Sequence, residues 1–460
     1  MFAIDYIVNM GASVMMPLIF IIFGLLLRIK FSRAFKAGLM VGIGFIGLSI
    51  TVNLMIDALT PISHAIVDRF GLQLTVIDVG WPAAAAVAMG TRVGALVIPV
   101  CVAINILMLY TRTTRVLNVD IWNLWHHAFT GSLVAIITDS LGWGIFAASV
   151  NCMITMVIAD RTVKDVEKHL NLPSIAVPHG FSVSFVPVAW LVCHIVDRIP
   201  KVRDIRIDTE SVQKHLAILG DPASLGAIIG AILAIIAHAS VRDILQTAVT
   251  MAAVMTIIPR MAKMLMEGVY PISERIQEIA QARAGSFGRI AIGLDSAVSV
   301  GHPVTLSVSM LMIPVMLLLA AVVPGNEFLP FASLTGLPFA FVLVTAVCRG
   351  DMFRTLLTGL ATLTIALLIG TRLAPIVTST AVSTGFALPD GANSISSIDY
   401  AGAMLPWAII QAFWLKAVGV TVLSVLTLFL VWWNGKRLKQ EDRQFEQRNT
   451  LPSGENRHDV

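Results

Sequence analysis

The sequence predicts an all-α polytopic membrane protein with about eleven transmembrane helices, arranged as two inverted five-helix repeats plus a C-terminal helix. Three observations lead to this prediction: the composition, the number of long apolar runs and an internal repeat. Of the 460 residues, 57% are hydrophobic and 13% are charged, whereas a water-soluble domain has about 45–50% apolar and about 25% charged residues. The composition therefore excludes a water-soluble globular protein.

Eleven apolar runs supply the predicted transmembrane helices, each of which needs about 17 to 25 residues to cross a bilayer. The runs lie near residues 11–27, 37–59, 93–110, 122–139, 142–160, 222–238, 245–266, 303–323, 330–347, 353–372 and 405–433. A further apolar segment, residues 178–200, is interrupted by Pro178, Gly180 and Pro187. We expect this segment to be re-entrant, entering and leaving the membrane on the same side.

The basic residues determine the predicted topology. When the loop 28–36 is placed in the cytoplasm, as its four basic residues require, 27 of the 32 Lys and Arg residues fall on the cytoplasmic side. A crossing at 178–200 would instead put the loop 198–214 and the basic C-terminal segment outside. The N-terminus is therefore predicted outside and the C-terminus in the cytoplasm, with residues 436–460 as a cytoplasmic polar tail.

Two pairs of similar stretches indicate an internal duplication. LMIDALTPISHAI at 54–66 resembles MLMEGVYPISERI at 264–276, at an offset of 210, and AVPHG at 176–180 resembles ALPDG at 387–391, at an offset of 211. Because each repeat carries five spans, an odd number, the second copy begins on the opposite face of the membrane. Inverted repeats with irregular segments near the midplane are a common plan of transporters.

Charge and cysteine content exclude several other classes. The net charge of +4 is small and the basic residues lie between apolar segments, so no nucleic-acid partner is expected. The four cysteines (Cys101, Cys152, Cys193 and Cys348) lie in or beside apolar stretches without CxxC spacing, which is typical of buried apolar residues rather than of a disulfide or zinc framework. No GxxxxGK[ST] phosphate loop occurs, so an ATP-driven pump is not expected.

Four polar patches rich in glycine and proline interrupt the apolar runs: VIDVGWP at 76–82, PHGFSVS at 178–184, GLDSAVSVGHP at 293–303 and PDGANSISS at 389–397. Unwound backbone at membrane depth is tolerated only where it is buried in protein or lines a wet cavity. Polar side chains there are costly and usually functional. The candidate substrate-binding residues in these patches are Asp78, Trp81, His179, Asp295, His302, Asp390 and Asn393. The alternative is that they cap broken helices or, for Trp81, lie in an interfacial belt.

A further candidate lies in NVDIWNLWHHAFTG, residues 118–131. Trp122, Trp125 and His126 have the spacing of one face of a helix entering the membrane, and the alternative is an interfacial anchor. His126 and His127 point about 100° apart on a helix, so at most one of them faces a site. Two adjacent histidines do not make a metal site, and we expect neither a metal nor a cofactor.

The ligand class follows from the candidate side chains. They comprise carboxylates, imidazoles, an amide and an aromatic ring, with no Arg or Lys. Such a set suits a neutral polyhydroxylated molecule, because hydroxyls donate to carboxylates and accept from imidazoles while an aromatic face covers C–H groups. A sugar or a sugar alcohol is the predicted substrate.

Several motifs taken together resemble one family. They are KAGLMVGIGFIG, VIDVGWP, TRVLNVDIWNLWH followed by FTG, IAVPHG, IGLD with GH after it, VPGN and CRGDMFRTLLTG. From about residue 10 to 435 the chain resembles the galactitol-type membrane IIC component of the bacterial phosphoenolpyruvate-dependent sugar phosphotransferase system, in the ascorbate/galactitol superfamily.

The resemblance implies a homodimer in the bacterial plasma (inner) membrane that carries a polyol, galactitol first, by an elevator-type movement. The substrate would be phosphorylated in the cytoplasm by a phosphocysteine on a IIB partner, itself supplied by IIA. The sequence has neither a hydrophilic IIB domain nor a cytoplasmic reactive cysteine, so IIA and IIB should be separate chains. The chain would then be the transport subunit of a phosphotransferase complex.

The resemblance also implies a division of the membrane domain, residues 1–435. The scaffold would comprise about 1–60 and 215–270, and the mobile core about 61–200 and 271–410. The substrate would lie among the broken segments around Asp78 to Trp81, His126, His179 and Asp295. Pro61 and Pro271, where the repeated stretches end a scaffold helix, would be hinges between scaffold and core. The alternative is that each proline simply ends a helix.

Two other functions remain open. An ion-coupled secondary transporter of a polyol or sugar would use inverted repeats and midplane carboxylates equally well. It would deliver free substrate, whereas a phosphotransferase delivers phosphorylated substrate. A membrane receptor that does not transport would leave the four polar patches without a purpose.

Overall fold

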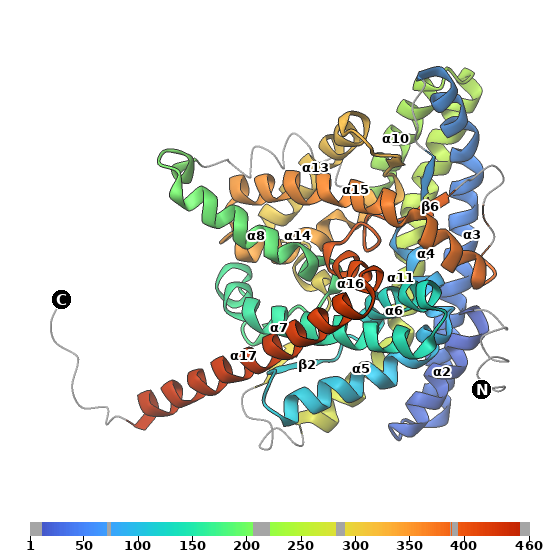
Figure 1. Cartoon of the computed structure of the whole chain (residues 1–460). Coiled ribbons are helices and arrows are strands. Elements are labelled where there is room, and N and C mark those ends of the chain that lie inside the picture. Colours follow the sequence, from blue (N-terminus) through green and yellow to red (C-terminus); the bar gives the residue numbers. More distant parts are fainter. Residues whose placement is uncertain are drawn as a thin grey trace.

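The computed structural model describes residues 12–70, 75–205, 221–281, 290–386, 388 and 394–450. Four helices pack together on one side of the molecule (Figure 1). They are α2 (Ala12–Leu26), α3 (Phe31–Phe70), α10 (Pro222–Ile236) and α11 (Val241–Gln281). The second pair begins 210 residues after the first, and the turns of both pairs contain a residue with left-handed backbone, Arg28 (φ 61°) and His238 (φ 56°). The offset of 210 between the stretches 54–66 and 264–276 is therefore also the offset between these two helix pairs.

Close approach of the backbones holds this four-helix group together. A Cβ on Gly226 of α10 would lie 2.4 Å from the carbonyl oxygen of Met251 in α11, and one on Gly268 of α11 would lie 2.5 Å from that of Ala37 in α3. Small residues at helix contacts allow such packing inside a membrane, where no hydrophobic effect drives helices together. An alanine at either position would push the helices apart.

Each helix pair is followed by the same succession of strands and helices. The first succession is β1 (Val76–Asp78), α4 (Gly80–Met89), α5 (Arg92–Tyr110), β2 (Val116–Asn118), η1 (Trp122–Leu124), α6 (Trp125–Thr138), α7 (Leu141–Leu170), β3 (Ile175–Ala176) and α8 (Gly180–Arg198). The second is β4 (Ala291–Gly293), η4 (Ser296–Ser299), α13 (Pro303–Val322), β5 (Phe328–Leu329), η5 (Ala332–Gly336), α14 (Leu337–Val347), α15 (Met352–Ser383), β6 (Ser394–Ser396) and α16 (Met404–Trp414). The short η2 (Val202–Asp204) follows α8, and α17 (Lys416–Thr450) ends the described chain.

The six short strands form two parallel three-stranded sheets that interlock the repeats. One sheet has the order β5-β1-β6 and the other β2-β4-β3. Exchanging each strand for its counterpart in the other repeat converts one sheet into the other, so each sheet takes its central strand from one repeat and both edges from the other. These strands were not predicted, because two or three residues are too few to show a period. Their pairing satisfies backbone groups where the helices are interrupted.

The strand register corrects the second pair of repeated stretches. Ile175 of β3 lies opposite Ile292, the middle residue of one central strand, and Ile395 of β6 lies opposite Ile77, the middle residue of the other. Residue 175 therefore corresponds to 395, an offset of 220. The alignment of AVPHG with ALPDG at an offset of 211 is wrong, and His179 corresponds to Asp399.

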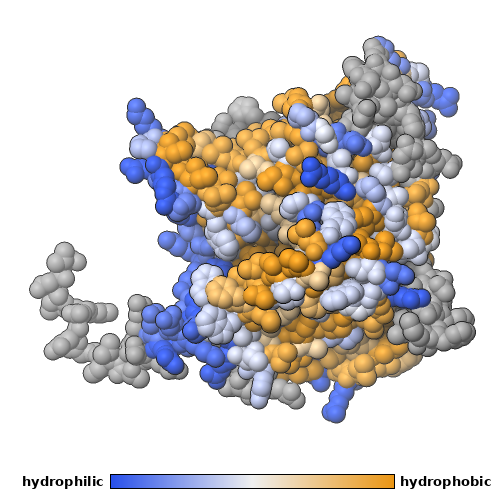
Figure 2. Space-filling model, viewed as in Figure 1, coloured by the Kyte–Doolittle hydropathy of each residue, from blue (hydrophilic) through white to orange (hydrophobic). Residues whose placement is uncertain are grey.

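The described helices include six that are long and apolar enough to cross a membrane: Arg92–Tyr110, Leu141–Leu170, Gly180–Arg198, Pro303–Val322, Met352–Ser383 and Lys416–Gln444. In α17, Val418 and Leu428 are 73% and 63% exposed, as expected for lipid-facing side chains. Figure 2 shows broad apolar areas on this face of the molecule, with hydrophilic residues gathered at the left, where α8 and α17 extend in Figure 1. The chain is a multi-pass membrane protein of predominantly helical structure.

Three predicted boundaries differ from the structure. The run 405–433 is two helices, because the backbone turns at Leu415 and at Lys416, the first residue of α17, which has φ 53°. Pro187 lies inside α8 without interrupting it. The repeated stretches do not end helices: α3 continues from Pro61 to Phe70, and α11 from Pro271 to Gln281. The predicted scaffold–core boundaries at 60 and 270 thus fall inside these two helices.

Ion pairs gather the ends of several helices on one face. Asp197 at the end of α8 pairs with Arg349 at 2.7 Å and Arg354 at 2.8 Å, both near the start of α15. Asp165, near the end of α7, lies within electrostatic reach of Arg349. The ends of α7 and α8 therefore lie at the same face of the molecule.

The C-terminal helix joins the same face. Arg115 pairs with Glu441 at 3.0 Å and with Asp442 at 2.7 Å, and Lys164 pairs with Glu441 at 3.0 Å. Asn434 donates to Asp160 at 2.8 Å inside the contact between α17 and α7. These contacts fix α17 to the first repeat.

Candidate functional site

A cavity of about 150 Å³ lies where the interrupted segments of both repeats meet. Its lining consists of Trp81, Trp122, Asn123, Trp125, His126, His179, Phe181, Lys263, Asp295, Ala297, Gly336, Phe339 and Asp399. Most of these residues follow directly after a strand or open a helix. The sheets thus place polar side chains and helix starts around one small space.

His179 and Asp295 come together in this cavity from opposite repeats. Nε2 of His179 lies 3.9 Å from Oδ1 of Asp295. The backbone N–H of Ser182 donates to Nδ1 of His179 at 3.4 Å, which assigns the proton to Nε2 and directs it towards Asp295. The expectation that the two interrupted segments meet is confirmed by this geometry.

Asp295 is held by its own segment. Its Oδ1 accepts from the backbone N–H of Ala297 at 2.9 Å and from the hydroxyl of Ser296 at 3.3 Å. Both hydrogen bonds go to the same oxygen.

His126 offers the complementary hydrogen-bonding group. Its Nδ1 lies 2.8 Å from the carbonyl oxygen of Asn123 and must donate to it, so Nε2 is left as an acceptor. One imidazole thus donates and the other accepts, which matches a hydroxyl group. Gly180 permits this arrangement, because a Cβ there would lie 2.7 Å from Cβ of His126 and 3.2 Å from Cε2 of Tyr400.

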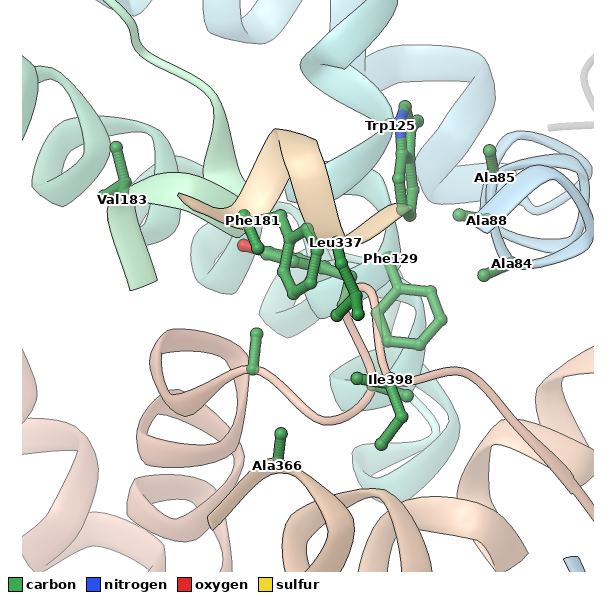
Figure 3. Packing of buried hydrophobic residues seen from close by; sticks show 14 of the residues in the cluster. Ala84, Ala85, Ala88, Trp125, Phe129, Phe181, Val183, Leu337, Ala366 and Ile398 are labelled. Carbon is green, nitrogen blue, oxygen red and sulfur yellow. The ribbon is translucent and has the colours of Figure 1, made fainter. Parts of the chain in front are cut away.

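Aromatic rings form the apolar part of the site. Trp125 stacks on His126 at 4.0 Å between ring centroids, and Tyr400 lies edge-on to both rings at 5.7 Å and 4.6 Å. Figure 3 shows Trp125 and Phe129 beside the alanines of α4, with Phe181 and Leu337 in the same packed layer. This packing fixes the rings that face the cavity.

His127 points away from the cavity. Its Nδ1 lies 3.2 Å from Oδ1 of Asn151, whose amide group donates to Thr130 at 2.6 Å and to Tyr400 at 2.7 Å. The expectation that at most one of the two adjacent histidines faces the site agrees with this placement. The buried network behind the cavity supports Tyr400.

Asp78 does not line the cavity but ties the repeats together. Its carboxylate accepts from the backbone N–H groups of Gly80 at 3.0 Å, Phe331 at 2.7 Å and Ser333 at 2.8 Å. The hydroxyl of Ser333 donates to it at 2.7 Å. These four bonds occupy about the full accepting capacity of a carboxylate.

The remaining predicted residues have different positions. Trp81 lines the cavity. His302 precedes α13 outside the cavity lining and is half-buried. Asp390 and Asn393 lie outside the described residues.

Two charged cavity residues, Asp399 and Lys263, were not predicted. Asp399 follows the polar patch at 389–397, and only the strand register reveals that it corresponds to His179. Lys263 lies in the middle of α11, not in a cytoplasmic loop, and it lines the cavity. The prediction that the site contains no Lys or Arg is therefore wrong.

Comparison with known proteins matches residues 6–391 to the family described as PTS system sugar-specific permease component, EIIC-GAT. The chain belongs to this family. It is 38% identical to the "Putative permease IIC component" of Escherichia coli (strain K12), over 91% of this chain and 95% of the relative. It is also 38% identical to the "PTS system galactitol-specific EIIC component" of Escherichia coli, strains K12 and O157:H7, over 89% of this chain and 90% of each relative. The cavity described above is thus the candidate sugar site of a PTS permease.

Proposed function

We propose that this PTS permease translocates galactitol, which binds in the cavity between His179, Asp295, His126 and the tryptophan rings. The observation that carries the proposal is the pair of imidazoles, one donating and one accepting, beside a carboxylate and aromatic faces. A polyol presents hydroxyl groups and C–H faces to match them. Lys263 at the cavity does not exclude a neutral ligand, because its three N–H groups can donate to hydroxyl oxygens.

Galactitol is proposed over other alditols because two relatives carry that substrate in their names at 38% identity. The phosphoryl donor is a phosphocysteine on a separate IIB chain, and IIA phosphorylates this cysteine again after each transfer. The substrate hydroxyl attacks phosphorus, the S–P bond breaks, and the hydroxyl proton passes to a base. The permease works as a homodimer in the bacterial inner membrane, where the core moves past the scaffold as an elevator.

The proposal is tested by following labelled galactitol into cells that express the permease with and without IIB. We expect galactitol phosphate to accumulate only when IIB and IIA are present. Accumulation of free galactitol under an ion gradient, independent of IIB, would favour the ion-coupled transporter instead. If a different alditol is taken up and phosphorylated instead, the substrate assignment changes but the proposed phosphotransferase mechanism stands.

The topology gives a prediction about the two equivalent turns of the four-helix group. Lys30 precedes α3 and Ser240 precedes α11, and both are exposed. If the repeats are inverted, the turns lie on opposite sides of the membrane. In a variant lacking the four buried cysteines, Ser240→Cys should react with an impermeant thiol reagent outside intact cells and Lys30→Cys should not. Labelling of both from one side would overturn the inversion.

Pro61 and Pro271 are proposed as hinges within α3 and α11. A proline inside a helix removes one backbone hydrogen bond and kinks the helix, and these two lie at equivalent positions near the connections to the core. Pro61→Ala and Pro271→Ala should alter the transport rate while galactitol affinity stays within a few-fold. Rates are measured by uptake and affinities on purified protein. Pro99→Ala, inside α5, is the matched control, and an unchanged rate in both variants would refute the hinge role.

A further inference from the structure

Asp399 is a buried carboxylic side chain at the cavity, and one of its oxygens has no hydrogen-bond partner in the described part of the chain. The residue is 2% exposed and lines the cavity beside Trp81 and Gly336. Its Oδ2 accepts from the hydroxyl of Ser397 at 3.1 Å, whereas Oδ1 is buried with no hydrogen-bond partner in the described part of the chain. A buried polar atom without a partner is costly and calls for an explanation.

The space for this oxygen is provided by a glycine. A Cβ on Gly336 would lie only 1.9 Å from Oδ1 of Asp399. Any other residue at 336 would therefore displace the carboxylate. Gly336, which also lines the cavity, thus leaves just enough room for this oxygen.

The fold gives Asp399 the same position in the second repeat that His179 has in the first. Each residue lies four positions after an isoleucine of an edge strand, Ile395 in β6 and Ile175 in β3. The two edge strands belong to different sheets. Polar groups therefore reach the same cavity from both sheets. His179 and Asp295 follow strands of one sheet, and Asp399 follows a strand of the other.

We propose that Asp399 is a second substrate ligand, which accepts a hydrogen bond from a polyol hydroxyl other than the one held by His179 and Asp295. This inference rests on the proposed function. An alditol carries a hydroxyl on every carbon, so two carboxylates fixed in separate sheets contact two positions of one chain. The spacing and stereochemistry of those two hydroxyls then determine which alditols fit.

The test is a double-mutant cycle between the protein and the ligand. Asp399→Asn keeps the shape and an acceptor for Ser397 but places an NH₂ group where Oδ1 was. We expect galactitol to bind about 5- to 150-fold more weakly, because the hydroxyl loses its acceptor and is left buried beside an N–H donor. The same two proteins are then tested with galactitol analogues that each lack one hydroxyl. The analogue that lacks the hydroxyl bound by Asp399 should have affinities for the wild type and the variant within about 2-fold of each other.

A structural role for Asp399 would weaken the binding of every analogue by the same factor, and that result would overturn the proposal. Gly336→Ala provides an independent variant, because it displaces Oδ1 while leaving the carboxylate charge, and it should show the same selective coupling. Asp139→Asn is the control, since Asp139 is exposed with a left-handed backbone (φ 48°) that Asn also adopts.

The wild-type measurement separates this inference from the proposed function. If the wild type binds another alditol and not galactitol, only the galactitol assignment fails, and the cycle is run with deoxy analogues of that alditol. If the wild type binds no alditol, both the function and the ligand role of Asp399 are overturned.

Discussion

Asp295→Asn should weaken galactitol binding about 10- to 150-fold, because a hydrogen bond between a carboxylate and a substrate hydroxyl contributes about 1.5–3 kcal/mol. The asparagine keeps the shape and an oxygen for Ala297, but it removes the charge that faces Nε2 of His179 at 3.9 Å. His179→Asn should have a similar effect, because its amide oxygen can still accept from the N–H of Ser182 but the shorter side chain has no donor at the position of Nε2. Binding is measured on purified protein without IIB.

The rate of substrate phosphorylation shows whether Asp295 only binds the substrate or also acts as a base. If Asp295 also takes the proton from the attacking hydroxyl, Asp295→Asn lowers the phosphorylation rate at saturating galactitol by a further factor of about 10² or more. Reduced affinity with normal saturated turnover would leave Asp295 as a ligand alone. Unchanged affinity in both variants would remove His179 and Asp295 from the site.

Asp78→Ala should be strongly destabilising, by at least about 3 kcal/mol, because it leaves three backbone N–H groups and one hydroxyl buried without their acceptor. Two of those N–H groups, on Phe331 and Ser333, belong to the other repeat. The variant should therefore melt at a lower temperature in detergent. Thermal unfolding followed by tryptophan fluorescence measures the change.

Ser333→Ala is the matched control for Asp78. It removes the hydroxyl that donates to Asp78 and accepts from the backbone N–H of Ile398 at 3.1 Å, so it should cost about 2 kcal/mol, less than Asp78→Ala. A normal melting temperature for Asp78→Ala, together with lost galactitol binding, would contradict the structural role and support substrate binding by Asp78 instead.

The parts of the site that the sequence predicts are polar groups within apolar runs. His179 and Asp295 could be found because each interrupts a run long enough to cross a membrane. Asp78 has the same signature, yet its partners Phe331 and Ser333 are 253 and 255 residues away. The sequence pattern therefore locates costly polar groups but cannot tell a substrate ligand from a carboxylate that joins two loops.

The missed features depend on long-range pairing. Lys263 was counted among the cytoplasmic basic residues because it lies close to the end of the apolar run at 266, whereas α11 continues to Gln281 while packed against α3. Asp399 could be recognised only from the register of β6 against β1, and a strand of three residues leaves no periodic signal. Its equivalence to His179 is set by backbone hydrogen bonds, on which the side-chain pattern carries no information.

The exchange of strands between the two sheets also constrains how such a chain could have arisen. One repeat alone supplies the central strand of one sheet and the two edges of the other. An ancestor of half the length would leave these hydrogen-bonding groups unpaired in the lipid, which is strongly unfavourable. It could satisfy them only with a second copy inserted in the opposite direction. Gene fusion would then have joined two copies that already depended on each other for their strand pairing. After the fusion, neither half could be lost, and neither could change its strand register without a matching change in the other.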